Sequence, residues 1–586
     1  MKAIRRGSSK KKDARPAMKK AAPRKRKVKV PPKPLALISV SDKTGLEFVA
    51  GALVDLGYEV VSTGGTHKAI SGASIPCLPI EKVSGVREFL DGRVKTLGHR
   101  VSAGILAKRS SRKHMQQLRR RGIRPVDVIV VNLYQFAQTV AKPGATHDEI
   151  IEQIDIGGVT LLRAAAKNYG SGVIVIGDPA DYTELITALQ QGEVSEEQRM
   201  KWAMKAFRQT TIYDATIWQY FTGFFGTPGR AMFLEPVRDL RKPENGYQGK
   251  SVLCRDLLAP ADDPLAWPNW HFVEGNPGHV NLCGADSALR VMCRLAEAFR
   301  RNFNGRVPFI VVAAKHGNPC GVGVDWDDPN LAIERAMAGD KDAVMGAEVM
   351  CNFVVDGEQA IRIHTVLKKM REKVKRDLWG VDVVCAAGFS EGAISLLSTR
   401  STGRHLLANP AMTDPVMSPQ DCEVRLIRGG ALIQGPANFI FDQNQVEEWL
   451  GNRRLSPDEL ATLLIAWVVA WEGVSNSVVL AKDLMLIGTG LGQQDRRGAT
   501  KLAITRAQDA GHNPLGAFFA SDGFFPFAVA AEGELLEAIQ MLKMAGCSGG
   551  VVPADGKRWP EVREYILKSG MVVAALDKKF RGFAKH

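Results

Sequence analysis

The 586-residue sequence lacks any hydrophobic run near the roughly 18 residues that a membrane span needs, so we expect no membrane-spanning segment. Its nine cysteines are scattered, and none stands at a CxxC spacing. This odd, unpatterned set argues against a disulfide framework and indicates reduced thiols. The N-terminus also lacks the apolar core of a secretory signal, and we therefore expect a cytoplasmic protein.

Most of the chain has no large excess of positive or negative charge. The formal net charge is +16, but residues 1–34 hold 15 lysines and arginines against one acid, Asp13, a net +14 that leaves +2 for the other 552 residues. This proline-rich basic tail cannot bury apolar surface, so we predict that it is disordered. Two interpretations stay open: a solvated extension without a specific partner, or an arm that binds polyanions such as nucleic acid weakly.

Alternating strand and helix patterns begin directly after the tail. Leu35 to Ser39 is an apolar strand, and Leu46, Val49 and Leu53 then recur at helical spacing. Further strands are predicted at 58–62, 126–133 and 172–176, between helical stretches. Such alternation is typical of an α/β domain with a parallel sheet, which we assign to residues 35–222, ending in a helix over about 195–221.

The rest of the chain is again of the α/β type. A segment punctuated by glycine and proline, residues 223–250, is interpreted as a connection between domains. Beyond it, residues 251–586 contain apolar strands at 307–314, 381–386, 477–481 and 515–520. This region is long enough for two subdomains, with a break predicted near 425–460.

Two segments of the first domain are candidate anion sites. Thr63-Gly64-Gly65-Thr66 follows a predicted strand and opens a helix, where backbone N–H groups and hydroxyls bind phosphate. A purely structural glycine turn would look the same. Arg93 and Lys95 lie on the same side of an extended segment, which suits either an anionic substrate or a solvated basic edge.

Two further segments are candidates for proton transfer. Asp155-Ile-Gly-Gly158 opens a helix that ends at Lys167, a lysine that is either partly desolvated and reactive or simply solvated. Lys315-His316 follows the buried strand 307–314, where α/β sheets place ligands, and a histidine beside a lysine favours a neutral imidazole base. Cys320 lacks the second cysteine and the His-x-Glu pattern of zinc deaminases, so we predict no metal.

Two glycine- and aromatic-rich segments near the C-terminus stay ambiguous by themselves. The run Gly488-Thr-Gly-Leu-Gly-Gln493, with Arg496 and Arg497 behind it, is only a weak match to a dinucleotide fingerprint. Ser521-Asp-Gly-Phe-Phe-Pro-Phe527 is either core filling or a stacking wall for a flat heterocycle.

Taken in order, these motifs resemble one family over about 35–586, the bifunctional purine-biosynthesis enzymes that join a formyltransferase to IMP cyclohydrolase. The resemblance also rests on Ser39-Val-Ser-Asp-Lys-Thr-Gly45, Asn132-Leu-Tyr134 and Ser475-Asn476-Ser477. It implies formyl transfer from 10-formyltetrahydrofolate to aminoimidazole carboxamide ribotide (AICAR), then dehydrative closure of formyl-AICAR to IMP. It further implies a methylglyoxal-synthase-like N-terminal domain, two cytidine-deaminase-like subdomains without zinc, and a homodimer that shares the transformylase site.

The resemblance also implies roles for individual residues. In ring closure, Lys167 is the main proton-transfer group, with Lys95, Tyr134 and Asp155 around the ring, and the nucleotide is held by Ser41, Asp42, Lys43, Thr63, Gly64, Gly65, Thr66, Arg93, Thr96 and Asn132. In formyl transfer, His316 is the base, Lys315 stabilises charge, and Asn476 hydrogen-bonds the carboxamide or the base. Nucleotide contacts then fall on Arg241, Gly346, Asp382, Arg496 and Phe524, and folate contacts on Arg497, Phe525 and Pro526.

Several positions depart from the family pattern. Gly98-His99 replaces His-Pro, Lys242 and Tyr247 stand in an altered segment after Arg241, and Lys578 to Arg581 replaces the usual final arginine segment. Ala528-Val529 replaces Arg-Asp, whose carboxylate meets the folate. A buried donor without its partner costs about 1–3 kcal/mol, so we predict weaker folate binding than is usual, unless Glu532 or Asp555 substitutes.

Two alternatives to the full bifunctional enzyme stay open at this point. The first keeps cyclohydrolase activity with weak or altered formyl transfer, because the departures gather on the folate side. The second is a nucleic-acid-associated protein that acts through its basic tail. The near-neutral body, with both lysine-containing candidate sites present, favours the enzyme.

Overall fold

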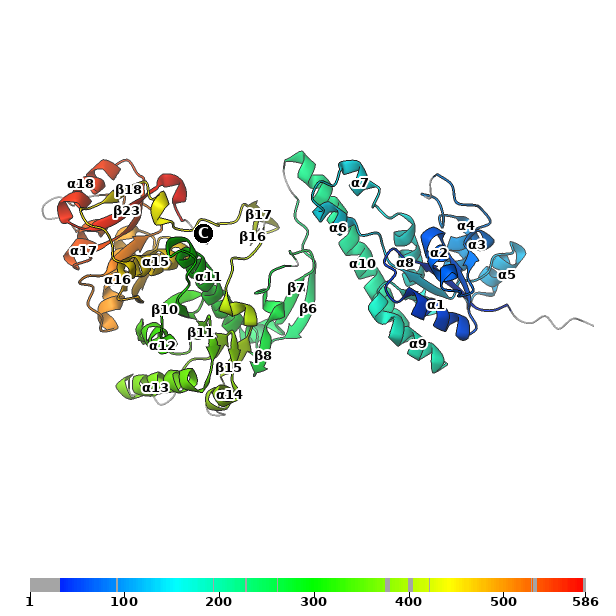
Figure 1. The fold of residues 1–586 in the computed structure, drawn as a ribbon, viewed down its shortest axis with the longest axis horizontal. Helices are drawn as coiled ribbons and strands as arrows, with labels where there is room; N and C mark the ends of the chain where they lie inside the picture. Colours follow the sequence, from blue (N-terminus) through cyan, green and yellow to red (C-terminus); the bar gives the residue numbers. More distant parts are fainter. Residues whose placement is uncertain are drawn as a thin grey trace, which may run out of the picture. The chain divides into compact units, whose positions relative to one another are not determined.

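The computed structural model describes residues 32–582, except 91–92, 193, 227–228, 261, 375–379, 399–403, 421, 528–529 and 531–534. The predictions for residues 1–31 and for Ala528, Val529 and Glu532 therefore lie outside the described residues. The chain divides into two compact units, Met1–Ala231 and Met232–His586 (Figure 1).

Unit 1 is built on a five-stranded parallel sheet in the order β3-β2-β1-β4-β5. These strands are β1 (Leu35–Ser39), β2 (Glu59–Ser62), β3 (Leu78–Pro79), β4 (Val128–Val131) and β5 (Ile174–Ile176). Crossover helices join them, as parallel pairing requires. The main ones are α1 (Leu46–Asp55), α2 (Gly64–Gly72), α4 (His99–Leu106) and α8 (Gly157–Lys167). Two further helices, α9 (Tyr182–Gln190) and α10 (Glu196–Thr222), follow the last strand.

The alternation of side chains along β1 explains the three layers of unit 1. Ala36 and Ile38 pack in one hydrophobic cluster with α1 and α9, whereas Leu35 and Leu37 pack in a second cluster with α4 and α8. The sheet is therefore covered by helices on both faces, which is why its strands are nearly continuous apolar runs. The long helix α10 lies along α8 (Figure 1).

Unit 2 contains a 12-stranded sheet made of two halves with the same plan. In each half a long helix precedes an antiparallel hairpin, a helix follows the hairpin, and three parallel strands with an antiparallel edge strand complete the sheet. The halves meet where β10 pairs with β20, at Gly323 and Met485.

The first half of the sheet contains β8 (His271–Glu274), β9 (Phe309–Lys315), β10 (Asn318–Asp325), β11 (Glu348–Cys351), β13 (Val383–Ala386) and β15 (His405–Ala408), with helices α11 (His279–Asn302) and α12 (Pro329–Ala338). The second half contains β18 (Glu448–Leu450), β19 (Val478–Lys482), β20 (Met485–Gly490), β21 (Phe518–Ser521), β22 (Gly549–Ala554) and β23 (Val572–Asp577), with α15 (Pro457–Glu472), α16 (Arg496–Asp509), α17 (Ala538–Met544) and α18 (Trp559–Ser569).

Smaller elements complete unit 2. They are the pairs β6 (Leu234–Asp239) with β7 (Val252–Asp256), β12 (Val354–Val355) with β14 (Gly388–Phe389) and β16 (Glu423–Ile427) with β17 (Gly430–Gln434), and helices α13 (Gly357–Val374) and α14 (Glu391–Leu397). The segment 223–250, interpreted from sequence as a connection, thus contains a strand. It was missed because β6 is exposed along most of its length and has no apolar alternation.

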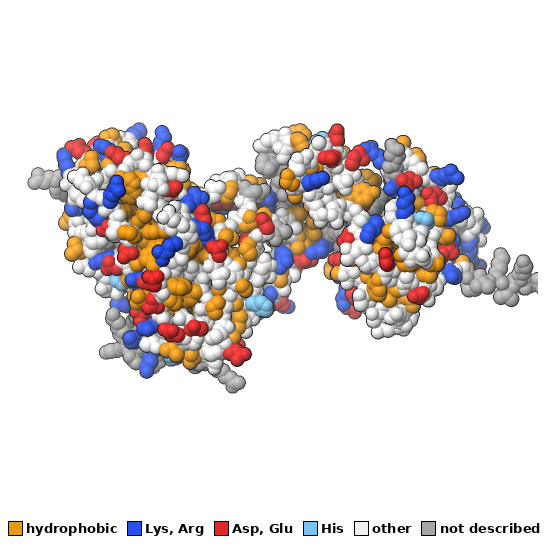
Figure 2. Space-filling view, viewed as in Figure 1, with side chains coloured by type: hydrophobic (Ala, Val, Ile, Leu, Met, Phe, Trp, Pro, Cys, Tyr) orange, Lys and Arg blue, Asp and Glu red, His pale blue; other side chains and the backbone are white. Residues whose placement is uncertain are grey.

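The two long helices tie the halves of unit 2 together. Helices α11 and α15 pack within one hydrophobic cluster, and Arg294 of α11 forms a buried ion pair with Glu472 of α15, Nε to Oε1 at 2.6 Å. The same guanidinium donates to the carbonyl oxygens of Ala437 and Phe439. On the face shown in Figure 2, acidic and basic side chains are interspersed over both units.

Candidate functional sites at two sheet edges

The first candidate site lies where the strand order of unit 1 reverses, between β1 and β4. Asn132, just after β4, accepts at Oδ1 from the backbone N–H groups of Ser41 (2.5 Å) and Asp42 (3.0 Å), and its Nδ2 donates to the Asp42 carbonyl oxygen (2.9 Å). The loops after two neighbouring strands are thus fixed to each other. Ligands of parallel α/β sheets bind at such a switch point, outside the carboxyl ends of the strands.

The turn after β2 lies at the same edge of the sheet, and hydrogen bonds of its threonine hydroxyl groups connect it to the loop after β1. Ser39 and Thr63 share a hydrogen bond of 3.0 Å between their Oγ atoms, and Lys43 Nζ donates to Thr66 Oγ1 at 3.2 Å. Burial lowers the pKa of Lys43. Gly64 and Gly65 open helix α2 beside these groups, so a helix N-terminus, hydroxyls and a cation converge here, as a phosphate requires.

Lys95 and Thr96 come from a different segment and reach this edge. Lys95 Nζ lies 3.6 Å from Glu88 Oε1 and 3.5 Å from the point where a Cβ on Gly64 would stand. Thr96 Oγ1 lies 3.0 Å from the corresponding point on Gly157, at the start of α8. A side chain at Gly157 would crowd the threonine, whereas the distance at Gly64 is an ordinary van der Waals contact with the lysine.

Asp155 sits at the beginning of α8 and is buried. Its Oδ1 accepts from Gly158 N–H at 2.6 Å, and its own N–H donates to the hydroxyl oxygen of Tyr213 at 2.8 Å. Burial raises the pKa of Asp155, while backbone N–H groups of Gly158, Tyr134 and Gly157 and the charge of Lys95 act in the opposite direction. Asp155, Lys95 and the backbone of Tyr134 are therefore neighbours, as the sequence predicted.

Two predicted residues do not join this cluster within one chain. Lys167 is exposed in the last turn of α8, beside Leu106, Arg163 and Phe207. Nine residues separate it from Gly158, about 14 Å along the helix axis, so its side chain lies at the far end of α8 from Asp155. Arg93 is exposed and pairs with Glu152.

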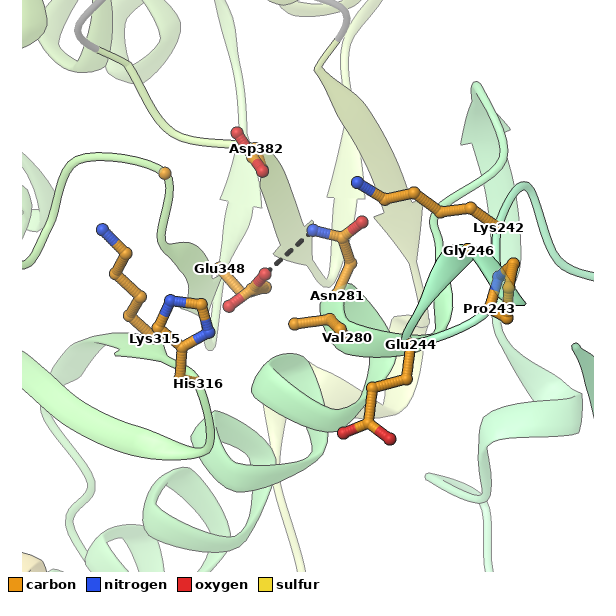
Figure 3. A pocket seen from close by; sticks show the side chains of 11 residues that line it. Lys242, Pro243, Glu244, Gly246, Val280, Asn281, Lys315, His316, Glu348 and Asp382 are labelled. Atoms are coloured by element: carbon orange, nitrogen blue, oxygen red, sulfur yellow. Dashed lines mark hydrogen bonds between the residues drawn. The ribbon is translucent and has the colours of Figure 1, made fainter. Parts of the chain in front are cut away.

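The second candidate site is a pocket of about 340 Å³ in unit 2. Figure 3 shows Lys315 and His316 on one side and Lys242 and Pro243 on the other, with Asp382 and Glu348 between them. It brings together four predicted residues, Lys315, His316, Gly346 and Asp382. Arg241 adjoins Lys242, and its charge acts on His405 together with that of Asp382. Lys242 lines the pocket, whereas Tyr247 is 89% exposed.

A tight hairpin turn presents the Lys315-His316 pair. Lys315 ends β9 and pairs with Asn318 at the start of β10, so His316 and Gly317 form a two-residue turn with φ of 51° and 75°. Two positive φ values are characteristic of the type I′ turn. A histidine in the left-handed region costs about 1–2 kcal/mol, and strain of this kind is concentrated at functional positions. Lys315 Nζ donates to the Met345 carbonyl oxygen at 2.6 Å.

Sequence reasoning missed two polar residues of this pocket. Glu348 is 3% exposed, and its Oε1 accepts from Asn281 Nδ2 at 3.0 Å. Asn281 Oδ1 in turn accepts from Gly278 N–H at the start of α11. A signal was present in the sequence: Glu348 is the one charged residue in the apolar run Ala347-Glu-Val-Met-Cys351.

The other residues predicted for formyl transfer lie at the same edge of the sheet but several strands away. Asn476 precedes β19, and its Nδ2 donates to the Gln493 carbonyl oxygen at 2.9 Å. Arg496 is buried against Asp522, whose Oδ1 also accepts from Ser477 N–H at 2.8 Å. Because β9 and β19 are three strand spacings apart, about 14 Å, these groups do not line the Lys315-His316 pocket.

The aromatic segment after β21 divides between core and surface. Phe525, assigned by resemblance to the folate side, is 1% exposed and packs near Phe519, with ring centroids 6.2 Å apart. Its ring fills the core, and a folate contact of Phe525 stays a prediction. Phe524 is partly exposed, and Pro526 and Arg497 are exposed and free to meet a ligand. Within residues 32–582, gaps aside, no cluster of three or more His, Cys, Asp or Glu side chains could hold a metal ion.

Comparison of the sequence with known protein families gives a match in each unit. Residues 165–506 match the family described as "AICARFT/IMPCHase bienzyme", and residues 45–160 match "MGS-like domain". None of the helices in the described part of the chain has the length and apolarity to traverse a bilayer.

Curated relatives match over most of their length. The "Bifunctional purine biosynthesis protein PurH" of Anoxybacillus flavithermus is 37% identical over 501 residues, which cover 85% of this chain and 91% of the relative. The protein of the same name from Oceanobacillus iheyensis is 34% identical over 558 residues, 94% of this chain and 99% of the relative. A solved structure titled "Crystal structure of ForH" is 34% identical, with a TM-score of 0.30, and covers 34% of this chain and 100% of its own. The first family match covers more than half of the residues of this chain. The chain therefore belongs to the AICARFT/IMPCHase bienzymes, which formylate AICAR and close the product to IMP.

Proposed function

We propose that the two activities of this bienzyme are divided between the two units, ring closure at the β1–β4 edge of unit 1 and formyl transfer in the pocket of unit 2. The observation that carries this division is the Lys315-His316 turn, which holds a base and a cation at the mouth of the pocket in unit 2. The hydroxyl- and glycine-rich edge of unit 1 supports binding of the phosphorylated product.

In formyl transfer, the amine of AICAR attacks the formyl carbon of 10-formyltetrahydrofolate. A nitrogen–carbon bond forms, the bond from that carbon to the folate nitrogen breaks, and the folate nitrogen leaves with a proton. His316 is the base that takes the proton from the amine, and Lys315 stabilises the negative charge that develops on the formyl oxygen. The fixed position of Lys315 Nζ, 2.6 Å from the Met345 carbonyl oxygen, supports this role.

Ring closure needs little beyond positioning and proton transfer, because both reacting groups belong to one molecule. The carboxamide nitrogen attacks the formyl carbon, and water leaves. Asp155 and Lys95 are a buried carboxylate and a cation that interact, and we assign them the exchange of protons with the carboxamide and the departing oxygen. Tyr134 is assigned a place beside the ring.

The same proposal assigns residues in the second half of unit 2 to binding of the nucleotide and the folate. Asn476, Arg496 and Phe524 are assigned to AICAR, and Arg497 and Pro526 to the folate. Because β19, which Asn476 precedes, is about 14 Å from β9 along one sheet edge and β21, which Phe524 follows, is one strand farther, a complete site requires two surfaces to meet. That requirement supports a homodimer in which one copy supplies His316 and the other supplies Asn476.

The repeated plan of unit 2 supports the proposed subdomain type. Each half has a helix, an antiparallel hairpin, a second helix and three parallel strands. We propose that both are cytidine-deaminase-like folds in which no zinc ion is bound. The nine cysteines are free thiols, which supports a reducing, cytoplasmic location.

Lys167 is proposed to act across the dimer. It is exposed and lines a pocket of about 320 Å³ together with Leu106, Arg163 and Phe207, so its amino group is accessible to a second copy of the chain. Lys167→Ala alone is expected to abolish ring closure and to leave formyl transfer intact. The measurement that locates Lys167 is a mixture of Lys167→Ala with Asp155→Asn chains, each inactive in ring closure by itself.

If Lys167 serves the partner's site, mixed dimers contain one intact site. Equal mixing then restores about a quarter of the parent rate, because half of randomly paired dimers are mixed and one of their two sites is complete. If the mixture stays inactive although exchange of chains is verified, Lys167 does not act across the dimer. Normal ring closure by Lys167→Ala alone removes the residue from the mechanism.

The division of activities is tested by supplying each intermediate separately. The Asp155→Asn protein with AICAR and 10-formyltetrahydrofolate is expected to accumulate formyl-AICAR without IMP. The His316→Asn protein with formyl-AICAR is expected to form IMP. If either variant loses both activities while its thermal unfolding is unchanged, the two reactions are not divided as proposed.

A further inference from the structure

Glu348 is a buried acid that lines the pocket proposed for formyl transfer. The mechanism proposed for that reaction assigns it no role. It begins β11 at the edge of the sheet, where its backbone pairs with Ala314 of β9 on one side and Val383 of β13 on the other. This register places its carboxyl group between Lys315, which follows Ala314, and Asp382, which precedes Val383. All three residues line the pocket (Figure 3).

Only one of the two carboxyl oxygens of Glu348 is satisfied. Oε1 accepts from Asn281 Nδ2 at 3.0 Å, but Oε2 is buried without a hydrogen-bond partner among the described residues. Oε2 lies against α11 at Gly284, only 2.1 Å from the point where a Cβ would stand. A buried carboxylate in this position would be poorly solvated, so the site favours the neutral acid.

The groups that face Glu348 come from every neighbouring element. They are Lys315 on β9, His316 in its turn, Asp382 before β13, Lys242 and Glu244 across the pocket, and the thiols of Cys283, Cys320 and Cys385 on α11, β10 and β13. Burial raises the pKa of all three thiols, which keeps them neutral. The two charges that chiefly act on the Glu348 carboxyl group are therefore those of Lys315, which favours its ionised form, and of Asp382, which favours its neutral form.

Burial and, to a lesser extent, the Asp382 charge raise the pKa of Glu348 to about 7, against the opposing effects of the Asn281 amide and the Lys315 charge. The group is thus protonated below about pH 7 and ionised above it. In an unfolded chain a glutamate titrates near 4.3. The ionisation that occurs here near neutral pH therefore depends on the folded pocket.

We propose that Glu348 is a positioning residue for formyl transfer that must hold its proton while the reaction proceeds, so that the positive charge of Lys315 acts at full strength. This inference rests on the proposed transfer site in unit 2. An ionised carboxylate beside Lys315 cancels part of the positive field that stabilises the oxyanion. Glu348 itself exchanges no proton with the substrate.

The test compares Glu348→Gln with the parent protein in formyl transfer to AICAR from pH 6 to pH 9, at saturating substrates. Glutamine keeps an acceptor for Asn281 but does not titrate. The parent rate is expected to fall with a midpoint near pH 7. The ratio of the variant rate to the parent rate should therefore rise from about one at pH 6 to about 30-fold at pH 8.5, where a group of pKa 7 retains its proton in about 3% of molecules. Glu391→Gln, an exposed glutamate on α14, should give a flat ratio near one.

A purely structural role of Glu348 would change the rate by the same factor at every pH. A flat ratio for Glu348→Gln therefore overturns the proposal. If that variant does not fold, Gly284→Ala provides the test, because its Cβ must push the carboxyl group out of its buried position. The alkaline fall in transfer is then expected at lower pH, and an unmoved profile contradicts the inference. A parent protein without any transfer activity would instead refute the proposed function.

Discussion

Replacing His316 by asparagine is expected to slow formyl transfer by about 10²–10⁴-fold, the usual effect of removing a positioned base. Asparagine tolerates the left-handed backbone that φ of 51° imposes at this position, whereas alanine adds turn strain to the loss of the base. Ring closure of supplied formyl-AICAR should continue at the parent rate, because His316 belongs to unit 2. The measurement is the rate of formyl-AICAR formation under single-turnover conditions.

The matched control for this prediction is His364→Asn. His364 is an exposed histidine on α13 and does not line the pocket, so its replacement should leave transfer within about twofold of the parent. Transfer by His316→Asn at the parent rate would mean that another group deprotonates the amine, and the role of the hairpin turn would then be limited to binding.

Asp155→Asn is expected to slow ring closure by about 10²–10⁴-fold and to spare formyl transfer. Asparagine can still accept from Gly158 N–H, so the start of α8 should keep its conformation, but the charge beside Lys95 is lost. Formyl-AICAR should therefore accumulate when AICAR and the folate donor are both supplied. The measurement is the conversion of purified formyl-AICAR to IMP.

Asp148→Asn gives the matched control for Asp155. Asp148 is exposed in the first turn of α7 (His147–Ile151), and its replacement should leave ring closure near the parent rate. Thermal unfolding of both variants separates a loss of fold from a loss of chemistry. Ring closure by Asp155→Asn at the control rate would exclude Asp155 from proton transfer and leave Lys95 as the group to test.

The backbone of unit 1 could be predicted well from the sequence because its signals are local. The strand Leu35–Ser39 and the helix over 195–221 correspond to β1 and to α10 (Glu196–Thr222), since apolar runs and periodicity depend only on neighbouring residues. The alternation of these signals also predicted a parallel sheet, and the phosphate-type turn at Thr63–Thr66 lies at its edge as expected.

The parts that could not be predicted from the sequence depend on contacts between distant segments. Phe525 and Phe524 are identical neighbours in sequence, yet one ring is buried against Phe519 and the other is partly exposed, and only the packing of β21 decides which. Lys167 and Asp155 are close in sequence, but the length of α8 separates them. Glu348 stands out in the sequence as a lone acid in an apolar run, but its neighbours Lys315 and Asp382 follow only from the register of β11.

The central claim is that one chain carries out both reactions, and the most direct test follows the nucleotide through them. Purified full-length protein is incubated with AICAR and 10-formyltetrahydrofolate, and AICAR, formyl-AICAR and IMP are resolved over time. The account predicts that formyl-AICAR appears first and that IMP then accumulates in proportion to the tetrahydrofolate released. Failure to form either product, under conditions in which the PurH protein of Anoxybacillus flavithermus makes IMP, would contradict it.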